Sequence, residues 1–328
     1  MENLVNLFFL HISINILIFI FKDYLKKKIN VYDYPDFKKK LHKRPVPLIG
    51  GWILLFNLIF FLFSSYSQLS ILEIKIIFCS FFFIIVGALD DKYQLSSYTK
   101  ISTLLVALII FFNFNENLII NNLKIYNYNI YLDNHLGLFF SILCVLLFVN
   151  AFNLFDGINL QSSLYGFYFL LFLFFKGFLV EIIFIILIAL VLIVYLNHKN
   201  RIYMGDSGTL FLGFVISILI IANYNIKNSL KVDEIFLLMF LPGVDMFRLF
   251  VQRILGKKNP FLGDREHLHH YFLKIYGYNH AIFSTLGIAI LPSLLNLFFD
   301  SKFLIPFFII FYLFLFIFLK KKIIKPVI

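Results

Sequence analysis

Charged side chains are scarce in this sequence of 328 residues: Asp, Glu, Lys and Arg make up 14%, while apolar residues make up 61%. This balance excludes an ordinary soluble domain and indicates an integral membrane protein. Cysteine is also scarce, and Cys79 and Cys144 lie in apolar runs without paired spacing. Disulfides and thiolate metal sites are therefore not expected.

Two motifs of membrane proteins are missing as well. The pattern His-Glu-x-x-His does not occur, which argues against an intramembrane metalloprotease. No internal repeat of the kind found in many secondary transporters is visible. A transporter with intramembrane carboxylates is nevertheless the alternative function to be weighed, because acidic side chains do occur near the apolar runs.

Long apolar runs are abundant, and a helix needs about 20 such residues to cross a bilayer, fewer when its polar ends reach the interface. A single helix over 160–196 would be longer than ~50 Å, so Lys176 and Gly177 predict a turn between two spans. We therefore expect an all-α integral membrane protein that forms one polytopic domain over residues 1–328. Its eleven predicted spans are 4–21, 48–63, 71–89, 101–115, 136–153, 160–175, 178–196, 208–223, 234–250, 281–297 and 303–319.

The distribution of lysine and arginine predicts the orientation, because cytoplasmic loops carry the excess of these residues. With eleven spans and the N-terminus outside, the cytoplasmic loops hold 22 of them and the opposite loops hold five. A lysine-rich segment follows the first span and no basic segment precedes it, which favours a retained anchor over a cleaved signal peptide. The net charge of +11 is thus mainly a topology signal and requires no nucleic acid partner.

Unusual polar residues gather at the predicted cytoplasmic ends of the spans, although the lysine and arginine counts that set the topology do not include them. Alone, each cluster could be a solvated helix end or a surface loop, but five on one membrane face indicate a functional site. They are Asp90 with Asp91, the group Asn153, Asp156 and Asn159, then Asp206, Asp245, and the segment 259–272 with Arg265, His267, His269 and His270.

The chemistry of these side chains suits a metal ion and phosphate groups. Paired carboxylates with a third carboxylate and an amide oxygen suit Mg²⁺. Asn153 and Asp156 stand at i and i+3, so both could reach one ion or diphosphate if the helix continues. Asp206 begins a Gly-Asp-Ser-Gly turn at a helix start, where backbone N–H groups suit phosphate. Arginine and histidine side chains suit phosphate and leaving-group charge.

Five segments, in this order, resemble the polyprenyl-phosphate N-acetylhexosamine-1-phosphate transferases, the group that contains MraY, WecA and TagO. The resemblance runs over nearly the whole chain. The segment "DREHLHH" and the proline-containing "RPVP" resemble the WecA and O-antigen-initiating branch more than the peptidoglycan branch. The five segments are HKRPVPLIGG (42–51), GALDDKYQLS (87–96), NAFNLFDGIN (150–159), MGDSGTLFLG (204–213) and PFLGDREHLHHYF (260–272).

The resemblance implies an eleven-helix enzyme, with its N-terminus outside, in the inner membrane of a bacterium. Its reaction would transfer a sugar 1-phosphate from a UDP-N-acetylhexosamine to a polyprenyl phosphate at the cytoplasmic face, release UMP and start a cell-surface glycan. Mg²⁺, or Mn²⁺ in its place, would be the cofactor. The implied roles are metal binding by Asp206, Asn153 and Asp91, catalysis by Asp90 and Asp91, and substrate binding by Asp156, Asn159, Lys100, Arg265, His267, His269 and His270.

One departure from the family concerns the donor side of the predicted site. Many relatives continue the third segment as Asp-Gly-x-Asp-Gly-Leu-Ala, whereas this chain has Asn159 and Leu160 where the second Asp and Gly stand. The identity of the donor sugar is therefore open. Separately, residues 116–135 predict an outer loop with a β-hairpin around Tyr126 to Asn129, which on its length alone is our candidate for a homodimer contact.

Overall fold

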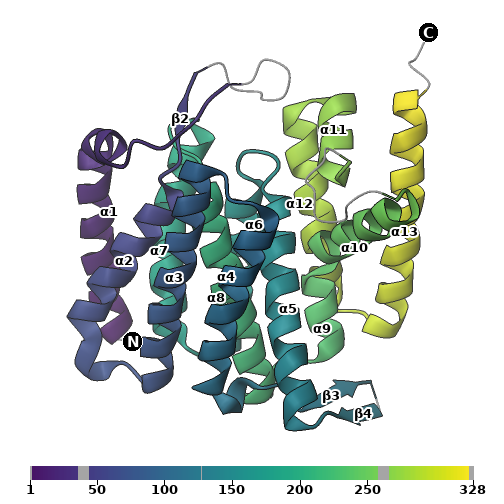
Figure 1. The fold of residues 1–328 in the computed structure, drawn as a ribbon, viewed down its shortest axis with the longest axis horizontal. Coiled ribbons are helices and arrows are strands. Elements are labelled where there is room, and N and C mark those ends of the chain that lie inside the picture. Colours follow the sequence, from purple (N-terminus) through teal and green to yellow (C-terminus); the bar gives the residue numbers. More distant parts are fainter. Residues whose placement is uncertain (1, 36–43, 127, 258–265, 325–328) are drawn as a thin grey trace.

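The structure, a computed structural model, describes residues 2–35, 44–126, 128–257 and 266–324. The chain is predominantly helical and its long helices run side by side (Figure 1). The helices are α1 (Glu2–Ile29), α2 (Gly50–Ser65), α3 (Ile71–Tyr93), α4 (Ser97–Asn113), α5 (Asn134–Phe155), α6 (Gln161–Lys176), α7 (Val180–His198), α8 (Gly205–Asn225), α9 (Val232–Leu238), α10 (Phe240–Leu255), α11 (Leu268–Tyr276), α12 (Tyr278–Leu295) and α13 (Ser301–Ile324).

The helices agree with the apolar runs of the sequence. Within the described ranges, eight helices are long and apolar enough to cross a membrane, and α4 is a shorter apolar helix. The chain is thus a mostly helical, multi-pass membrane protein, as expected. The predicted turn at Lys176 and Gly177 is confirmed, because α6 ends at Lys176 and Gly177 adopts a φ of +72° before α7 begins.

The predicted span 234–250 is wrong as one continuous helix, because the chain divides there into α9 and α10 at Met239. The cause lies four residues after Leu238, where Pro242 has no N–H to donate to the Leu238 carbonyl. The hydroxyl of Tyr165 on α6 donates to that carbonyl instead, at 2.5 Å. The break turns α10 to run obliquely beside the long helices (Figure 1).

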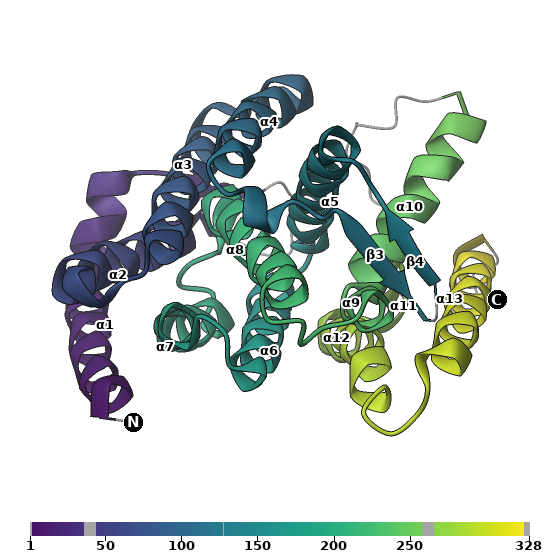
Figure 2. The same ribbon diagram turned by 90° about the horizontal axis from the view of Figure 1, so that it is seen from below.

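Helix α8 lies at the centre of the bundle (Figure 2) and packs against α2, α3, α5 and α6. Most of its side chains are buried. Glycines let its neighbours come close: a Cβ added to Gly87 on α3 would lie 2.4 Å from the Cα of Ser207, and one added to Gly51 on α2 would lie 2.5 Å from the Ser207 Oγ. Small residues at such contacts are how apolar helices pack tightly in lipid.

In the described parts of the chain, four short strands lie outside the helices. β3 (Asn122–Ile125) and β4 (Tyr128–Tyr131) form an antiparallel pair, which confirms the hairpin predicted around Tyr126 to Asn129. The Tyr224 hydroxyl on α8 donates to the Asn122 carbonyl and accepts from the Lys124 N–H. A second pair, β1 (Tyr32–Asp33) and β2 (Val46–Pro47), lies at the opposite end of the bundle (Figure 1).

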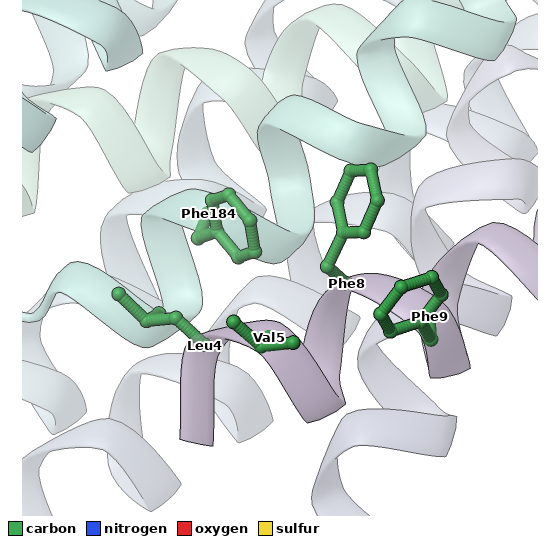
Figure 3. A pocket seen from close by; sticks show the side chains of 5 residues that line it. All are labelled: Leu4, Val5, Phe8, Phe9 and Phe184. Atoms are coloured by element: carbon green, nitrogen blue, oxygen red, sulfur yellow. The ribbon is translucent and has the colours of Figure 1, made fainter. Parts of the chain in front are cut away.

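Helix α1 contacts the bundle in two ways. Buried polar side chains join it to α2: His11 Nδ1 lies 3.0 Å from Asn57 Oδ1, and Asn57 Nδ2 donates to Asn15 Oδ1 at 3.1 Å. In an apolar layer such hydrogen bonds help helices to associate. Near its start, α1 forms an apolar groove with α7, lined by Leu4, Val5, Phe8, Phe9 and Phe184 (Figure 3). The groove has no titratable side chain and therefore suits lipid contact rather than chemistry.

Candidate active site

The predicted site residues within the described ranges lie at one end of the bundle, the upper end in Figure 1. Helices α3 and α5 finish there, and α4, α8 and α11 begin there. The hairpin β3–β4 lies at the other end (Figure 1). Helices that alternate in direction thus bring distant motifs together.

A lysine joins two of the predicted carboxylates. Lys100 Nζ, in the first turn of α4, lies 2.6 Å from Asp90 Oδ2 and 3.3 Å from Asp206 Oδ2. The other oxygen of Asp90 accepts the Leu95 N–H at 2.8 Å. Asp90 is 7% exposed, so its charge depends on this lysine for neutralisation.

Asn153 completes this cluster from the last turn of α5. Its Nδ2 donates to Asp206 Oδ1 and to Thr209 Oγ1, each at 2.8 Å. Asp206 is therefore held on one oxygen by an amide and on the other by a lysine. The structure brings together side chains from α3, α4, α5 and α8 at this point, as expected from the sequence.

Asp91 faces the backbone of α8. Its Oδ1 accepts the Asp206 N–H at 2.7 Å and its Oδ2 accepts the Ser207 N–H at 3.1 Å. The carboxylate thus stabilises the positive end of α8 and fixes the place of Asp206. Gly205 is required here: its φ is +71°, and an added Cβ would lie 2.7 Å from Asp91 Oδ2. The predicted metal and catalytic roles of Asp91 stay predictions.

The donor set agrees with a magnesium ion. Among the described residues no three His, Cys, Asp or Glu side chains gather closely enough to hold a metal. Mg²⁺, however, commonly binds one or two carboxylates and takes its other ligands from water and substrate phosphates. Asp206, Asp90 and the amide of Asn153 supply such a set, and Lys100 already brings a positive charge to the same carboxylates.

Asp156 has a different partner from Asn153. Helix α5 ends at Phe155, so the helical continuation that would put both side chains on one face is not present. The Asp156 carboxylate instead accepts a hydrogen bond from Ser162 Oγ on α6. Burial raises the pKa of Asp156 to about 8, and the Ser162 hydroxyl opposes that rise. Asp156 lies beside the site, and its contact with the substrate stays a prediction.

The histidine segment is organised by Asp245 on α10. Its carboxylate accepts hydrogen bonds from Tyr312 at 2.5 Å, from Arg248 at 2.8 Å and from the Leu268 N–H at 3.3 Å, and His267 Nδ1 lies 2.8 Å away. Because a carboxylate only accepts, Nδ1 of His267 carries the proton in this contact. The Nε2 atom of His267 is buried and has no hydrogen-bond partner among the described residues.

His269 links this segment to the end of α5. A Cβ added to Gly157 would lie 1.9 Å from His269 Nε2, so only glycine fits against the ring. Burial holds the pKa of His269 well below its usual range, which makes the ring neutral at neutral pH. The His270 ring lies 4.2 Å from that of His269, centroid to centroid. Arg265 lies outside the described residues.

Asp245 stands out in the sequence without a predicted role, and Arg248 and Tyr312 were not among the predicted site residues. A signal was present for the arginine, since an ionisable residue inside an apolar run is costly and requires a partner. Arg248 Nη2 also donates to the Glu266 carbonyl at 2.6 Å, next to His267. No sequence signal marked Tyr312, which lies 67 positions from Asp245 along the chain.

Comparison with known proteins agrees with this arrangement of motifs. Residues 74–224, which carry the clusters from α3 to α8, match the glycosyl transferase family 4. This part of the chain is therefore similar to members of that family. The chain is 27% identical over 284 residues to an undecaprenyl-phosphate alpha-N-acetylglucosaminyl 1-phosphate transferase of Escherichia coli O157:H7, which covers 82% of this chain and 76% of the relative.

A second relative comes from Bacillus subtilis (strain 168). It is named a probable undecaprenyl-phosphate N-acetylglucosaminyl 1-phosphate transferase and is 27% identical over 274 residues, or 78% of this chain and 73% of the relative. Relatives of this kind agree with the branch that the motifs predicted. They give no support to the transporter alternative.

Proposed function

We propose that this protein transfers N-acetylhexosamine 1-phosphate from a UDP-sugar to a membrane polyprenyl phosphate, with release of UMP. One observation carries the proposal: Asp90, Lys100, Asp206 and Asn153, from four helices, meet at one end of an apolar bundle. The names of the family relatives support the same reaction, with undecaprenyl phosphate as acceptor and N-acetylglucosamine as sugar. The product would start a cell-surface glycan.

We place this end of the bundle at the cytoplasmic face of a bacterial inner membrane. Eleven spans with the N-terminus outside put 22 lysines and arginines in the loops of this face and five in the opposite loops, with α9 and α10 together counted as one span. A UDP-sugar is a cytoplasmic metabolite, so its site belongs there. The β3–β4 hairpin, with exposed Tyr128 and Tyr131, then lies outside and stays our candidate for a homodimer contact.

The reaction needs positioning and charge neutralisation more than proton transfer. An oxygen of the lipid phosphate attacks the β-phosphorus of the UDP-sugar. The bond from that phosphorus to the oxygen bridging the two phosphates breaks, and its electron pair leaves with UMP. A phosphate monoester has a second pKa near ~6, so the lipid phosphate is mostly dianionic beforehand.

In this proposal, Lys100 is the cationic side chain that meets the transferred phosphate, and Asp90 holds it in place at 2.6 Å. Asp90 also orients the lipid phosphate and accepts any remaining proton. Asp206 and Asn153, with Asp90 or Asp91, would hold Mg²⁺, which neutralises charge on the diphosphate. Asp91 fixes the start of α8 and so the position of Asp206.

The histidines are proposed to contact UMP, the leaving group of the reaction. His267, oriented by Asp245 through Nδ1, has a buried Nε2 that is left to contact the departing group. His269 is neutral, so it acts as a hydrogen-bonding group and not as a charge. Arg265 and His270 are proposed to offset the charge of UMP. Asp156 is proposed as the carboxylate that contacts the donor.

The experiment is a transfer assay in membranes of a host that lacks its own enzyme of this kind. The full chain is expressed, radiolabelled UDP-N-acetylglucosamine and undecaprenyl phosphate are added, and extractable lipid is counted. We expect lipid labelling that depends on Mg²⁺, is lost with a chelator and returns when Mg²⁺ or Mn²⁺ is added, with UMP and not UDP released. Absence of labelling with any of several UDP-amino sugars would contradict the proposal.

A further inference from the structure

The loop between α5 and α6 carries the departure from the family pattern, at Asn159 and Leu160. The structure gives the amide of Asn159 a complete set of partners within the protein. Its Nδ2 donates to the Asn197 carbonyl at 3.0 Å and to Asn200 Oδ1 at 2.8 Å. Its Oδ1 accepts the Leu160 N–H at 3.1 Å. The Nδ2 atom of Asn159 therefore ties the loop to the end of α7, while its Oδ1 holds the next N–H within the loop.

Leu160 is the reason such a tie is needed. Its φ is +73°, in the left-handed region that a leucine rarely adopts. Strained backbone of this kind persists only where its surroundings hold it. Here two amide oxygens, Asn159 Oδ1 and Asn197 Oδ1, both accept the Leu160 N–H, at 3.1 and 3.0 Å. A glycine, which the family pattern described above has at this position, would adopt such a conformation without strain.

The backbone turn at Leu160 also fixes the position of the first residues of α6. The Leu160 carbonyl accepts a hydrogen bond from Ser163 Oγ at 3.1 Å. Ser162, the neighbour of Ser163, donates to the Asp156 carboxylate. Asp156 is the only carboxylate between the end of α5 and the start of α6. The orientation of that carboxylate thus depends on the turn, and the turn depends on the amides.

We propose that Asn159 is a positioning residue: with Asn197 and Asn200 it forms an amide latch that holds the strained turn at Leu160 and thereby aims Asp156 at the donor. This inference rests on the proposed function, because it assigns Asp156 to the UDP-sugar. It differs from direct contact between Asn159 and the donor. It also predicts that the relatives' aspartate does not suit this chain, since a carboxylate cannot donate to the Asn197 carbonyl.

The test compares Asn159→Ala, Leu160→Gly and the double variant in the full-length enzyme, with KM for UDP-N-acetylglucosamine and kcat measured separately. Loss of the latch should raise KM about 10-fold while kcat changes about 2-fold or less, the size of effect of one or two hydrogen bonds. In the double variant, Leu160→Gly should bring the raised KM of Asn159→Ala most of the way back to that of the unmodified enzyme, because glycine adopts the turn without the latch. If the double variant is as impaired as Asn159→Ala, the latch is overturned in favour of direct contact.

Asn159→Asp provides the second arm, with Asn225→Asp as its matched control. Asn225 Nδ2 also donates to a backbone carbonyl, that of Ile119 at 2.9 Å, but at the far end of the bundle. We expect Asn159→Asp to raise KM as Asn159→Ala does, and Asn225→Asp to leave KM unchanged. A lower KM for Asn159→Asp would overturn the latch. Turnover of the unmodified enzyme in the same membranes tests the proposed function separately.

Discussion

The two halves of the site are built in different ways. In the carboxylate half, Asp90, Lys100, Asp206 and Asn153 are joined by direct hydrogen bonds, and they stand on α3, α4, α8 and α5. In the histidine half, short helices α10 and α11 meet at the single carboxylate of Asp245, which collects Tyr312, Arg248, the Leu268 N–H and His267. In the first half the charged groups are predicted site residues that pair with one another. In the second half the charge of Asp245 is paired with side chains that lie behind the histidines.

This difference predicts which substitutions should abolish turnover and which should only reduce it. A carboxylate in the first half has a proposed place in the reaction, so loss of its charge should remove turnover. Asp245 in the second half contacts His267 and would act only through it, so its loss should weaken turnover without removing it. Gly157 and His269 form a contact between the halves.

The largest effect is expected for Asp206→Asn, which keeps the shape of the side chain and removes its charge. Turnover should fall by at least about 100-fold, in line with the loss of one electrostatic group from a transfer site. Asp133→Asn is the matched control, because Asp133 caps α5 at the opposite end and asparagine caps a helix equally well. The transfer assay, with protein amount measured by immunoblot, gives the comparison; equal turnover of the two variants would remove Asp206 from the site.

A smaller effect is expected for Asp245→Asn, which should lower kcat about 10- to 100-fold by releasing the orientation of His267. Tyr312→Phe removes one donor to the same carboxylate and should cost about 5-fold or less. kcat/KM measured for both variants in detergent-solubilised enzyme tests this order. If Tyr312→Phe were the more damaging change, Asp245 would not be the centre of the histidine half.

Gly157→Ala tests the contact between the halves. The new Cβ would lie 1.9 Å from His269 Nε2, so the loop or the ring must move, and turnover should fall about 10-fold. A smaller side chain removes the clash, so adding His269→Ala should make the glycine change nearly harmless relative to His269→Ala alone. A double-mutant cycle of transfer rates measures this coupling, and purely additive losses would mean that the two halves act independently.

The smallest effect on chemistry, but a clear one on stability, is expected for Gly87→Ala. Its Cβ would lie 2.4 Å from the Cα of Ser207, a backbone atom that cannot turn aside, and overpacking of this kind costs about 1–3 kcal/mol. Gly287→Ala on α12 is the control, since nothing lies within 4 Å of its added Cβ. Thermal unfolding in detergent should give a lower midpoint for the first variant, while the second stays at or above that of the unmodified protein.

The histidine half was less visible in the sequence than the carboxylate half. Aspartates at the ends of apolar runs stand out because charges are costly there, and the distribution of lysine and arginine independently predicts that they share one membrane face. The partners of Asp245 come from α10, α11 and α13, and a tyrosine within an apolar run is unremarkable in a chain with 18 of them. The break at Met239 was hidden too, because Pro242 alone does not reveal that Tyr165 takes the Leu238 carbonyl.

The sequence by itself determined the membrane class, the turn at Gly177, the hairpin at β3–β4 and the gathering of polar motifs at one end. All of these follow from local patterns: the length of apolar runs, helix-breaking residues and charge counts. Only the tertiary structure decided which side chain meets which: that Lys100 joins Asp90 to Asp206, that Asp91 caps α8, and that Asn159 turns to α7. Such contacts join residues that are far apart in the chain, and periodicity carries no information about them.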